Sequence, residues 1–178
     1  WGTGMDNMPR VKPEYNPIFS HGHMVWLDTN LQQMLVDESL LNIGFYIERW
    51  QEIEDMEDEM KRLRAYVNEH LWDERTAFLY DRYGDGMLCT TKGIGAFWAL
   101  QADALDKERL DRMVAHLSDT TEFDRPHRVP SLSADHPKYN PLDQDVKLKD
   151  AIDKAETKAE KDSIRDYSQD RTVIKSVS

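Results

Sequence analysis

WLDTNLQQMLVDESLLNIGFYIERW, residues 26–50, turns the chain from a loop into a helix. Its apolar side chains recur at roughly three- and four-residue spacing, which is typical of a helix with one buried face. The residue types just after its first tryptophan are those that cap a helix N-terminus, and Asp28, Thr29 or Asn30 is predicted to do so. The core-facing positions are predicted to be Leu27, Leu31, Met34, Leu35, Leu41 and Phe45.

Three further segments carry a helical pattern. Residues 52–72 have an apolar stripe and acids crowded into the first turns, where the helix dipole favours negative charge. Residues 93–105 are predicted as an apolar helix and residues 106–117 as an amphipathic one. In residues 74–87, Phe78 and Tyr80 alternate with Leu79 and Asp81 ahead of the turn sequence YGDG, and this pattern predicts a short hairpin. The fold class is therefore predicted to be all-α, with helical hairpins packed side by side.

Loops and a tail complete the organisation. Residues 1–25 are rich in Gly, Pro, Asn and Met and are predicted as a loop. Residues 118–140 are irregular, and a loop of that length in a compact domain is usually functional or disordered. Residues 142–178 contain no Trp, Phe, Gly or Pro and are dominated by charged side chains. A domain over residues 1–141 and a helical or disordered tail over 142–178 are predicted.

Composition argues against several classes of protein. The 178 residues carry a formal net charge of -11, which repels phosphate backbones and disfavours nucleic-acid binding. The sequence has no apolar run near the ~20 residues of a membrane-spanning helix. Cys89 is the single cysteine, so an intrachain disulfide is excluded and a small buried side chain is expected. No nucleic-acid or membrane partner is expected, and a cytoplasmic location is favoured.

The first loop places polar side chains among glycines. Asp6 lies between Gly4 and Asn7 and is followed by Arg10. Glycines let a backbone approach a ligand closely, and Arg10 is suited to steer substrate hydroxyls or to hold a neighbouring carboxylate. Trp1 offers a flat apolar face of the kind on which sugars stack. Because Asp and Asn in loops are more often turn formers than catalysts, the spacing alone does not assign Asp6 a role.

A second candidate site precedes the first helix. His21 and His23 form an H-G-H pair that is able to ligate a transition metal, but no third ligand has diagnostic spacing. No metal is therefore predicted. Trp26, Asp28 and Asn30 lie just beyond, where a helix start directs them at the same space as the first loop.

A third candidate site is HRVPSLSADHPKY, which contains His127, Arg128, Ser131 and Asp135. A serine-hydrolase triad of Ser131, His127 and Asp135 is rejected. These residues share one short loop, no G-x-S-x-G elbow is present, and triads are usually assembled from separate elements.

Five segments together resemble a known family. GTGMDNMPR, WLDTN, LWDERTAFLYD, TTKGIGAFWAL and HRVPSLSADHPKY follow the order and spacing of glycoside hydrolase family 63 and mannosylglycerate-hydrolase-like enzymes, which are relatives of the trehalase group. The resemblance covers roughly residues 1–140. It implies an (α/α)6 toroid, two concentric rings of six helices, of which this chain would form part. It also implies hydrolysis of α-linked glucosides or mannosyl-type glycosides with inversion of the anomeric centre, and without a metal or organic cofactor.

The resemblance assigns roles to individual residues. The general acid of the family is the Asp of a G-x-D-N-x-P-R loop, which matches Asp6, and the Arg of that loop matches Arg10. LDTN resembles the V-D-L-N helix start of the trehalase relatives, and RVPSLS resembles a loop that walls the sugar site. The predicted substrate-binding residues are Trp1, Asn7, Arg10, Trp26, Asp28, Asn30, His127, Arg128 and Ser131.

The family pattern breaks at both ends. Chains of the family begin well before the acid loop, so this sequence resembles one that has been cut at Trp1. At the other end, the Gly-Tyr-Trp-Arg-Gly-type segment expected after residue 141 is absent. The family's catalytic base, a Glu, lies beyond that point, and no residue here matches it. The chain alone is therefore predicted to be inactive, and the apolar helix faces of a partial toroid predict self-association.

Two alternatives stay open at this point. A helical scaffold with the acidic tail as a binding arm would have no deep cavity near Asp6. A sugar lyase or epimerase on a related α/α toroid would use His or Tyr as its base. In that case His21, His23 or His127 would be essential and Asp6 dispensable.

Overall fold

The computed structural model describes residues 8–12, 23–126 and 129–139, and helical elements dominate this part of the chain. The α-helices are α1 (Leu27–Tyr46), α2 (Asp55–Tyr66) and α3 (Lys107–Val114). Shorter helical turns are η1 (Trp50–Glu52), η2 (Val67–Leu71), η3 (Ile94–Leu100) and η4 (Ala115–Ser118). The mainly helical class is confirmed. None of the helices in the described ranges combines the length and the apolar character that crossing a membrane requires.

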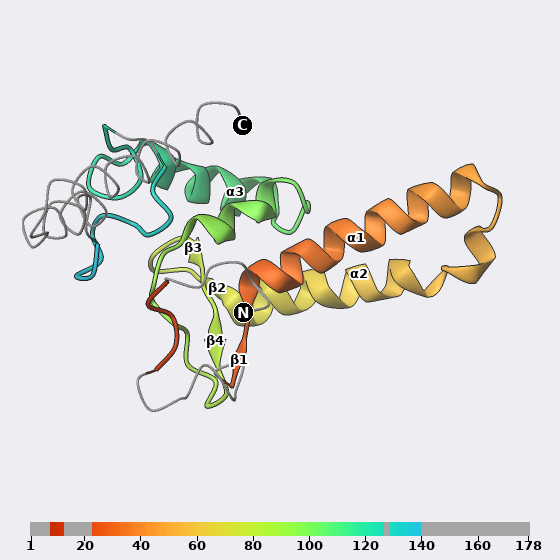
Figure 1. The fold of residues 1–178 in the computed structure, drawn as a ribbon, viewed down its shortest axis with the longest axis horizontal. Helices are drawn as coiled ribbons and strands as arrows, with labels where there is room; N and C mark the ends of the chain where they lie inside the picture. Colours follow the sequence, from red (N-terminus) through yellow and green to blue (C-terminus); the bar gives the residue numbers. More distant parts are fainter. Residues whose placement is uncertain (1–7, 13–22, 127–128, 140–178) are drawn as a thin grey trace, which may run out of the picture. The chain divides into compact units, whose positions relative to one another are not determined.

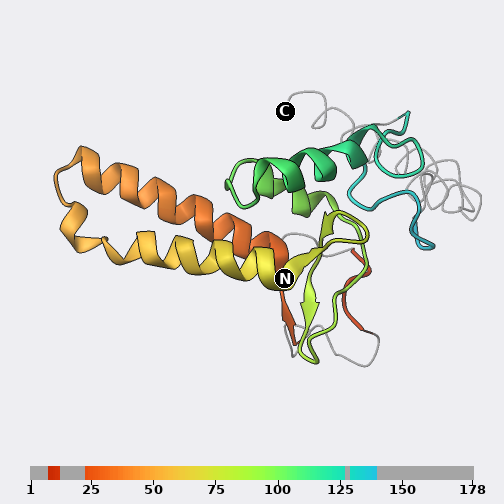
Figure 2. The same ribbon diagram turned by 180° about the vertical axis from the view of Figure 1, so that it is seen from behind.

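The first two helices form an antiparallel hairpin. Both views show α1 and α2 side by side along their length (Figures 1 and 2). Leu27, Leu31 and Met34 are buried as predicted. Phe45 is 77% exposed, so its prediction as a core residue was wrong. The periodicity identified its helix, but the far end of the hairpin extends past the strands and has little to pack against there (Figure 1).

The predicted caps of α1 were also wrong. The N-cap position is Trp26, whose side chain makes no cap hydrogen bond. Asp28 lies two residues past the N-cap position, and its Oδ1 accepts the adjacent amide of Thr29 at 3.0 Å. Asn30 instead donates from Nδ2 to the Trp26 carbonyl at 2.7 Å. The first amide of the helix is bound by Asp81 from a distant part of the chain.

The strands form two short antiparallel pairings, one of which joins a strand before the helical hairpin to a strand after it. Strand β2 (Trp72–Asp73) pairs with β3 (Phe78–Leu79), and β1 (Met24–Val25) pairs with β4 (Arg82–Tyr83). A β-hairpin is present, but residues 74–77 form its loop and join β2 to β3, whereas the predicted YGDG turn is closed by an isolated bridge between Arg82 and Leu88. The YGDG turn follows β4, where the Tyr83 amide donates to the Met87 carbonyl at 2.8 Å.

The segment predicted as an apolar helix over 93–105 is a 3-10 turn, η3, over a shorter range. Helix α3 begins as its sequence suggests, because the Asp106 side chain accepts the Arg109 amide at 2.9 Å. Residues 119–126 and 129–139 contain no helix or strand, apart from an isolated bridge between Gly93 and Leu132.

An aromatic cluster forms the centre of the core. The ring of Phe78, which is fully buried, lies 5.4 Å from Tyr80, 5.7 Å from Phe97 and 6.1 Å from Phe123, measured between centroids. Phe123 comes from the long irregular segment, so part of that segment belongs to the core. Cys89 is 2% exposed, as its interpretation as a small buried side chain predicted.

Candidate functional site

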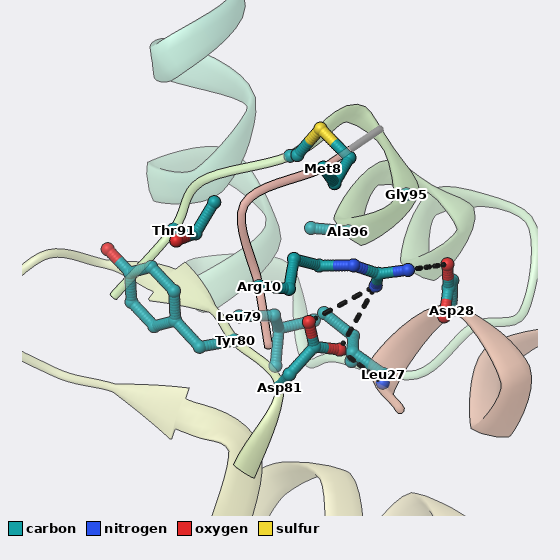
Figure 3. A pocket seen from close by; sticks show the side chains of 11 residues that line it. Met8, Arg10, Leu27, Asp28, Leu79, Tyr80, Asp81, Thr91, Gly95 and Ala96 are labelled. Carbon is teal, nitrogen blue, oxygen red and sulfur yellow. Dashed lines mark hydrogen bonds and ion pairs between the residues drawn. The ribbon is translucent and has the colours of Figure 1, made fainter. Parts of the chain in front are cut away.

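A buried arginine joins three separate parts of the chain. Arg10 donates from Nη1 to both carboxylate oxygens of Asp81, at 3.1 and 3.3 Å, and from Nη2 to Oδ2 of Asp28 at 3.2 Å (Figure 3). Its guanidinium lies over the ring of Trp26, 4.7 Å from the centroid. One cation therefore holds together the segment 8–12, the start of α1 and the link between β3 and β4.

Asp81 is the central acceptor of this cluster. Its Oδ1 also accepts the backbone amide of Leu27, the first residue of α1, at 2.8 Å. Burial raises the pKa of the Asp81 carboxyl above its ordinary value of 3.8, while Arg10 and the Leu27 amide oppose the shift and the nearby Asp28 adds to it. The carboxylate thus replaces the missing side-chain cap and balances part of the arginine charge.

Further hydrogen bonds fix the backbone of the segment 8–12. The Arg10 carbonyl accepts from Tyr83 Oη at 3.1 Å and from Cys89 Sγ at 3.4 Å. The carbonyl before it accepts from Thr91 Oγ1 at 3.3 Å. Burial raises the pKa of the Tyr83 phenol above its usual range, which keeps it protonated as a donor. Main chain and side chain of this segment are therefore held from different directions.

The cavity beside Arg10 is small. Its volume of about 20 Å³ is enough for a single water molecule and far too little for a sugar ring. The cluster therefore positions the loop, and any sugar must bind outside this cavity. Figure 3 shows the lining side chains, which come from Met8, Arg10, Leu27, Asp28, Leu79, Tyr80, Asp81, Thr91, Gly93, Gly95 and Ala96.

Gly95 allows η3 to approach this cluster. A Cβ at this position would lie 3.2 Å from Asp28 Cβ and 3.4 Å from Asp28 Oδ2, and that carboxylate is fixed by Arg10. We expect Gly95→Ala to lower the free energy of unfolding by about 1 kcal/mol, because overpacking forces fixed groups apart. Urea denaturation measures the change.

Gly93→Ala is the matched control for this substitution. A Cβ at position 93 would meet Met8 Cε at 2.7 Å, but that atom ends a flexible side chain that is able to move aside. The loss of stability should therefore be clearly smaller than for Gly95→Ala. Equal losses in the two variants would show that the Asp28 contact is not the tight one.

The structure brings some of the predicted site residues together. Arg10, Trp26 and Asp28 are in mutual contact through the arginine side chain. Of the two roles raised for Arg10, holding a neighbouring carboxylate is the one observed. Asn30 is turned back to its own helix, and Ser131 is exposed, with its carbonyl accepting from a backbone amide of η3 at 3.0 Å.

Other predicted site residues lie outside the described residues, so their roles stay predictions. They are Trp1, Asp6, Asn7, His21, His127 and Arg128. His23 is exposed, and Asp135 of the rejected triad pairs with Lys92 at 3.2 Å. Over the described ranges, His, Cys, Asp and Glu side chains form no group of three that could hold a metal ion.

Asp81 and Glu122 are among the buried polar residues that the sequence patterns did not predict. Asp81 was treated as part of a hairpin, although a carboxylate that directly follows the buried run 78–80 must find a partner. Glu122, also buried, accepts from Lys92 and lies 2.5 Å from His116 Nδ1. Although burial acts to lower the pKa of Lys92, the carboxylates of Glu122 and Asp135 outweigh it and raise the pKa.

Comparison with known proteins gives the family. The model of the mannosylglycerate hydrolase MGH1-like glycoside hydrolase domain matches residues 1–150. The chain belongs to this glycoside hydrolase family. The resemblance inferred from the five sequence segments is thereby confirmed. The MGH1-like match extends past residue 141, so the domain boundary placed there stays a prediction.

One similar protein is much longer than the aligned segment. An uncharacterized protein of Borreliella burgdorferi is 27% identical over 78 residues, which are 44% of this chain and 16% of the relative. The alignment therefore spans a small part of that relative, and the MGH1-like domain assignment rests on the family model.

Proposed function

We propose that this chain carries the acid half of an inverting glycosidase site, with Asp6 as the general acid. Membership of the MGH1-like family supports the reaction class. The observation that carries the proposal is the buried Arg10 cluster, because it fixes the backbone that directly follows Asp6 and Asn7 in the sequence. A general acid needs such a rigid support, since its proton must be delivered at a defined position.

The chemistry follows from inversion at the anomeric carbon. Asp6 protonates the leaving oxygen while a second carboxylate activates a water molecule on the opposite face of the sugar. The two carboxyl groups of inverting enzymes stand roughly 6.5–9.5 Å apart to leave room for that water. Asp28 and Asp81 are poor candidates for the base, because both are buried against Arg10. We assign the base to a residue outside this chain.

The proposed architecture is a part of an (α/α)6 toroid. The antiparallel α1–α2 hairpin is compatible with one repeat of such a ring. The substrate is proposed to be a glucosyl or mannosyl glycoside, with mannosylglycerate as the first compound to test because of the family name. The 178-residue chain alone is expected to release no sugar, since no residue in its sequence matches the catalytic base of the family.

The test compares variants in a complete protein that carries this chain. Asp6→Asn should abolish hydrolysis of mannosylglycerate or glucosylglycerate, while NMR of the first-formed sugar in the unsubstituted protein should show the inverted anomer. His127→Ala is the comparison for the lyase alternative, and it should weaken hydrolysis without abolishing it, because His127 is predicted to bind the substrate and not to transfer the proton. Activity that survives Asp6→Asn and disappears in His127→Ala would overturn the proposal. Turnover by the isolated chain would show that the base is not supplied from outside this chain.

A further inference from the structure

A second, larger hollow lies on the other side of Asp28. This groove, between the start of α1 and η3, has a volume of about 350 Å³ and is open to solvent. That volume is within the range of small-molecule sites, whereas the cavity at Arg10 is not. Asp28 lines both hollows, so the groove adjoins the cluster that supports the acid loop.

The walls of the groove are two facing rows of side chains. Asp28 and Gln32 are four residues apart on α1 and therefore lie on one face of that helix. The other wall comes from η3, in which side chains three residues apart are aligned because a 3-10 helix has three residues per turn. Gly95, Trp98 and Gln101 form this row.

The chemistry of the two rows fits a sugar ring. Trp98 is 39% exposed although its neighbour Phe97 is buried, so an indole face is available to stack on the apolar side of a pyranose. Gln32 and Gln101 carry amides, which both donate and accept hydrogen bonds and therefore match hydroxyl groups.

The charge of the groove favours a neutral ligand. Its one ionisable lining residue in the described part of the chain is Asp28, whose Oδ2 is already paired with Arg10. A carboxylate-bearing group would need a cation that this lining does not provide, and it would face the Asp28 carboxylate. A neutral sugar meets neither obstacle.

We infer that this groove binds the neutral hexopyranose unit of the glycoside, with Trp98 as the stacking platform and Gln32 and Gln101 as hydroxyl partners. The inference rests on the proposed function, and it excludes the acid group of a glycerate conjugate from this position. Gly95 supports the site by letting the Trp98 row approach α1 closely.

The experiment titrates the 178-residue chain with methyl α-mannoside and methyl α-glucoside through the millimolar range. The indole N–H signals of Trp98 and Trp50 are followed by NMR and assigned from the Trp98→Ala and Trp50→Ala variants. Trp50 is the matched control because it is 50% exposed at the far end of the α1–α2 hairpin. The Trp98 signal should shift saturably with a neutral glycoside, and the Trp50 signal should not.

Variants then test the individual contacts. Trp98→Ala, in which binding is followed by calorimetry because the Trp98 signal is absent, should weaken binding at least about tenfold, since it removes the apolar surface that the sugar covers. Trp50→Ala should leave the affinity unchanged. Gln101→Leu keeps the size of an exposed side chain and should weaken binding with an unchanged melting temperature. D-glycerate alone should not shift Trp98.

Each contrary result is decisive. The inference is wrong if neutral glycosides do not shift the Trp98 signal, if Trp98→Ala binds them with undiminished affinity, or if D-glycerate shifts the Trp98 signal equally. Its failure is separable from failure of the proposed function. If Asp6→Asn loses hydrolysis but no glycoside shifts the Trp98 signal, the proposed function stands and the sugar-binding role of the groove is wrong. If a glycoside shifts the Trp98 signal but hydrolysis does not depend on Asp6, the groove binds sugar and Asp6 is not the general acid.

Discussion

Arg10→Met should lower the free energy of unfolding by roughly 3–5 kcal/mol, because it leaves two buried carboxylates without their counter-charge. Asp28 and Asp81 are 1% and 4% exposed, so water cannot replace the guanidinium without opening the structure. Methionine retains much of the length and apolar character of the arginine stem, so the variant tests mainly the charge. Urea denaturation at neutral pH measures the loss.

Lys12→Met is the matched control for this variant. Lys12 belongs to the same segment and pairs with Asp85 at 2.6 Å, but its side chain is 26% exposed and that of its partner 46%. Because this pair is open to water and screened by salt, the control should lose much less stability than Arg10→Met. A loss in Arg10→Met no larger than in Lys12→Met would show that the buried cluster is not what holds the segment.

The loss in Arg10→Met should also depend on pH. The pKa of Asp81 is raised in the folded protein, so folding binds a proton, and the stability contributed by this group falls as pH rises from 3.8 through the folded value. Without Arg10 the pKa of Asp81 rises further, because the opposing attraction is gone. The difference in stability between the two proteins should therefore shrink on acidification. A constant or growing difference would contradict this account.

Phe78→Ala should be comparably destabilising, by roughly 3–5 kcal/mol, because it empties the centre of the aromatic core. Phe78 is fully buried, and its ring contacts those of Tyr80, Phe97, Phe123 and His116, with centroid distances of 5.1–6.1 Å. These side chains come from separate parts of the sequence and are unable to close the cavity without moving their backbones. Chemical denaturation measures this change too.

Phe45→Ala makes the same chemical change at an exposed position. Phe45 is 77% exposed on α1, so its loss should alter stability by no more than about 0.5 kcal/mol. If both phenylalanine variants lost similar stability, the core would not be centred on Phe78. The pair thus separates burial from the identity of the residue.

The sequence predicted the elements whose structure is decided locally. The period of apolar residues identified α1, and a short apolar stripe identified α3. The periodicity was less informative where tertiary contacts decide. It placed Phe45 in the core, since a pattern defines a helix face but not whether another element covers it.

The site was predicted in part for the same reason. Arg10 and Asp28 were predicted as site residues because each belongs to a recognisable sequence motif. Of the two roles raised for Arg10, the holding of a neighbouring carboxylate is observed. The partners of Asp81 could not be predicted from its neighbours in the sequence, since they are 54 and 71 residues away. The 3-10 form of η3 was also missed, and the row of Gly95, Trp98 and Gln101 depends on that form.

The binding of Leu27 and Arg10 by Asp81 has a consequence for the order in which the protein is assembled on the ribosome. Translation proceeds from the N-terminus, so both residues are synthesised before their shared acceptor exists. The α1–α2 hairpin, which ends at Tyr66, is complete at that stage and is able to form from local contacts. The nascent chain carries Arg10 without this carboxylate until residue 81 has been added. The contacts of Arg10 at the start of α1 are therefore completed after the α1–α2 hairpin has been synthesised.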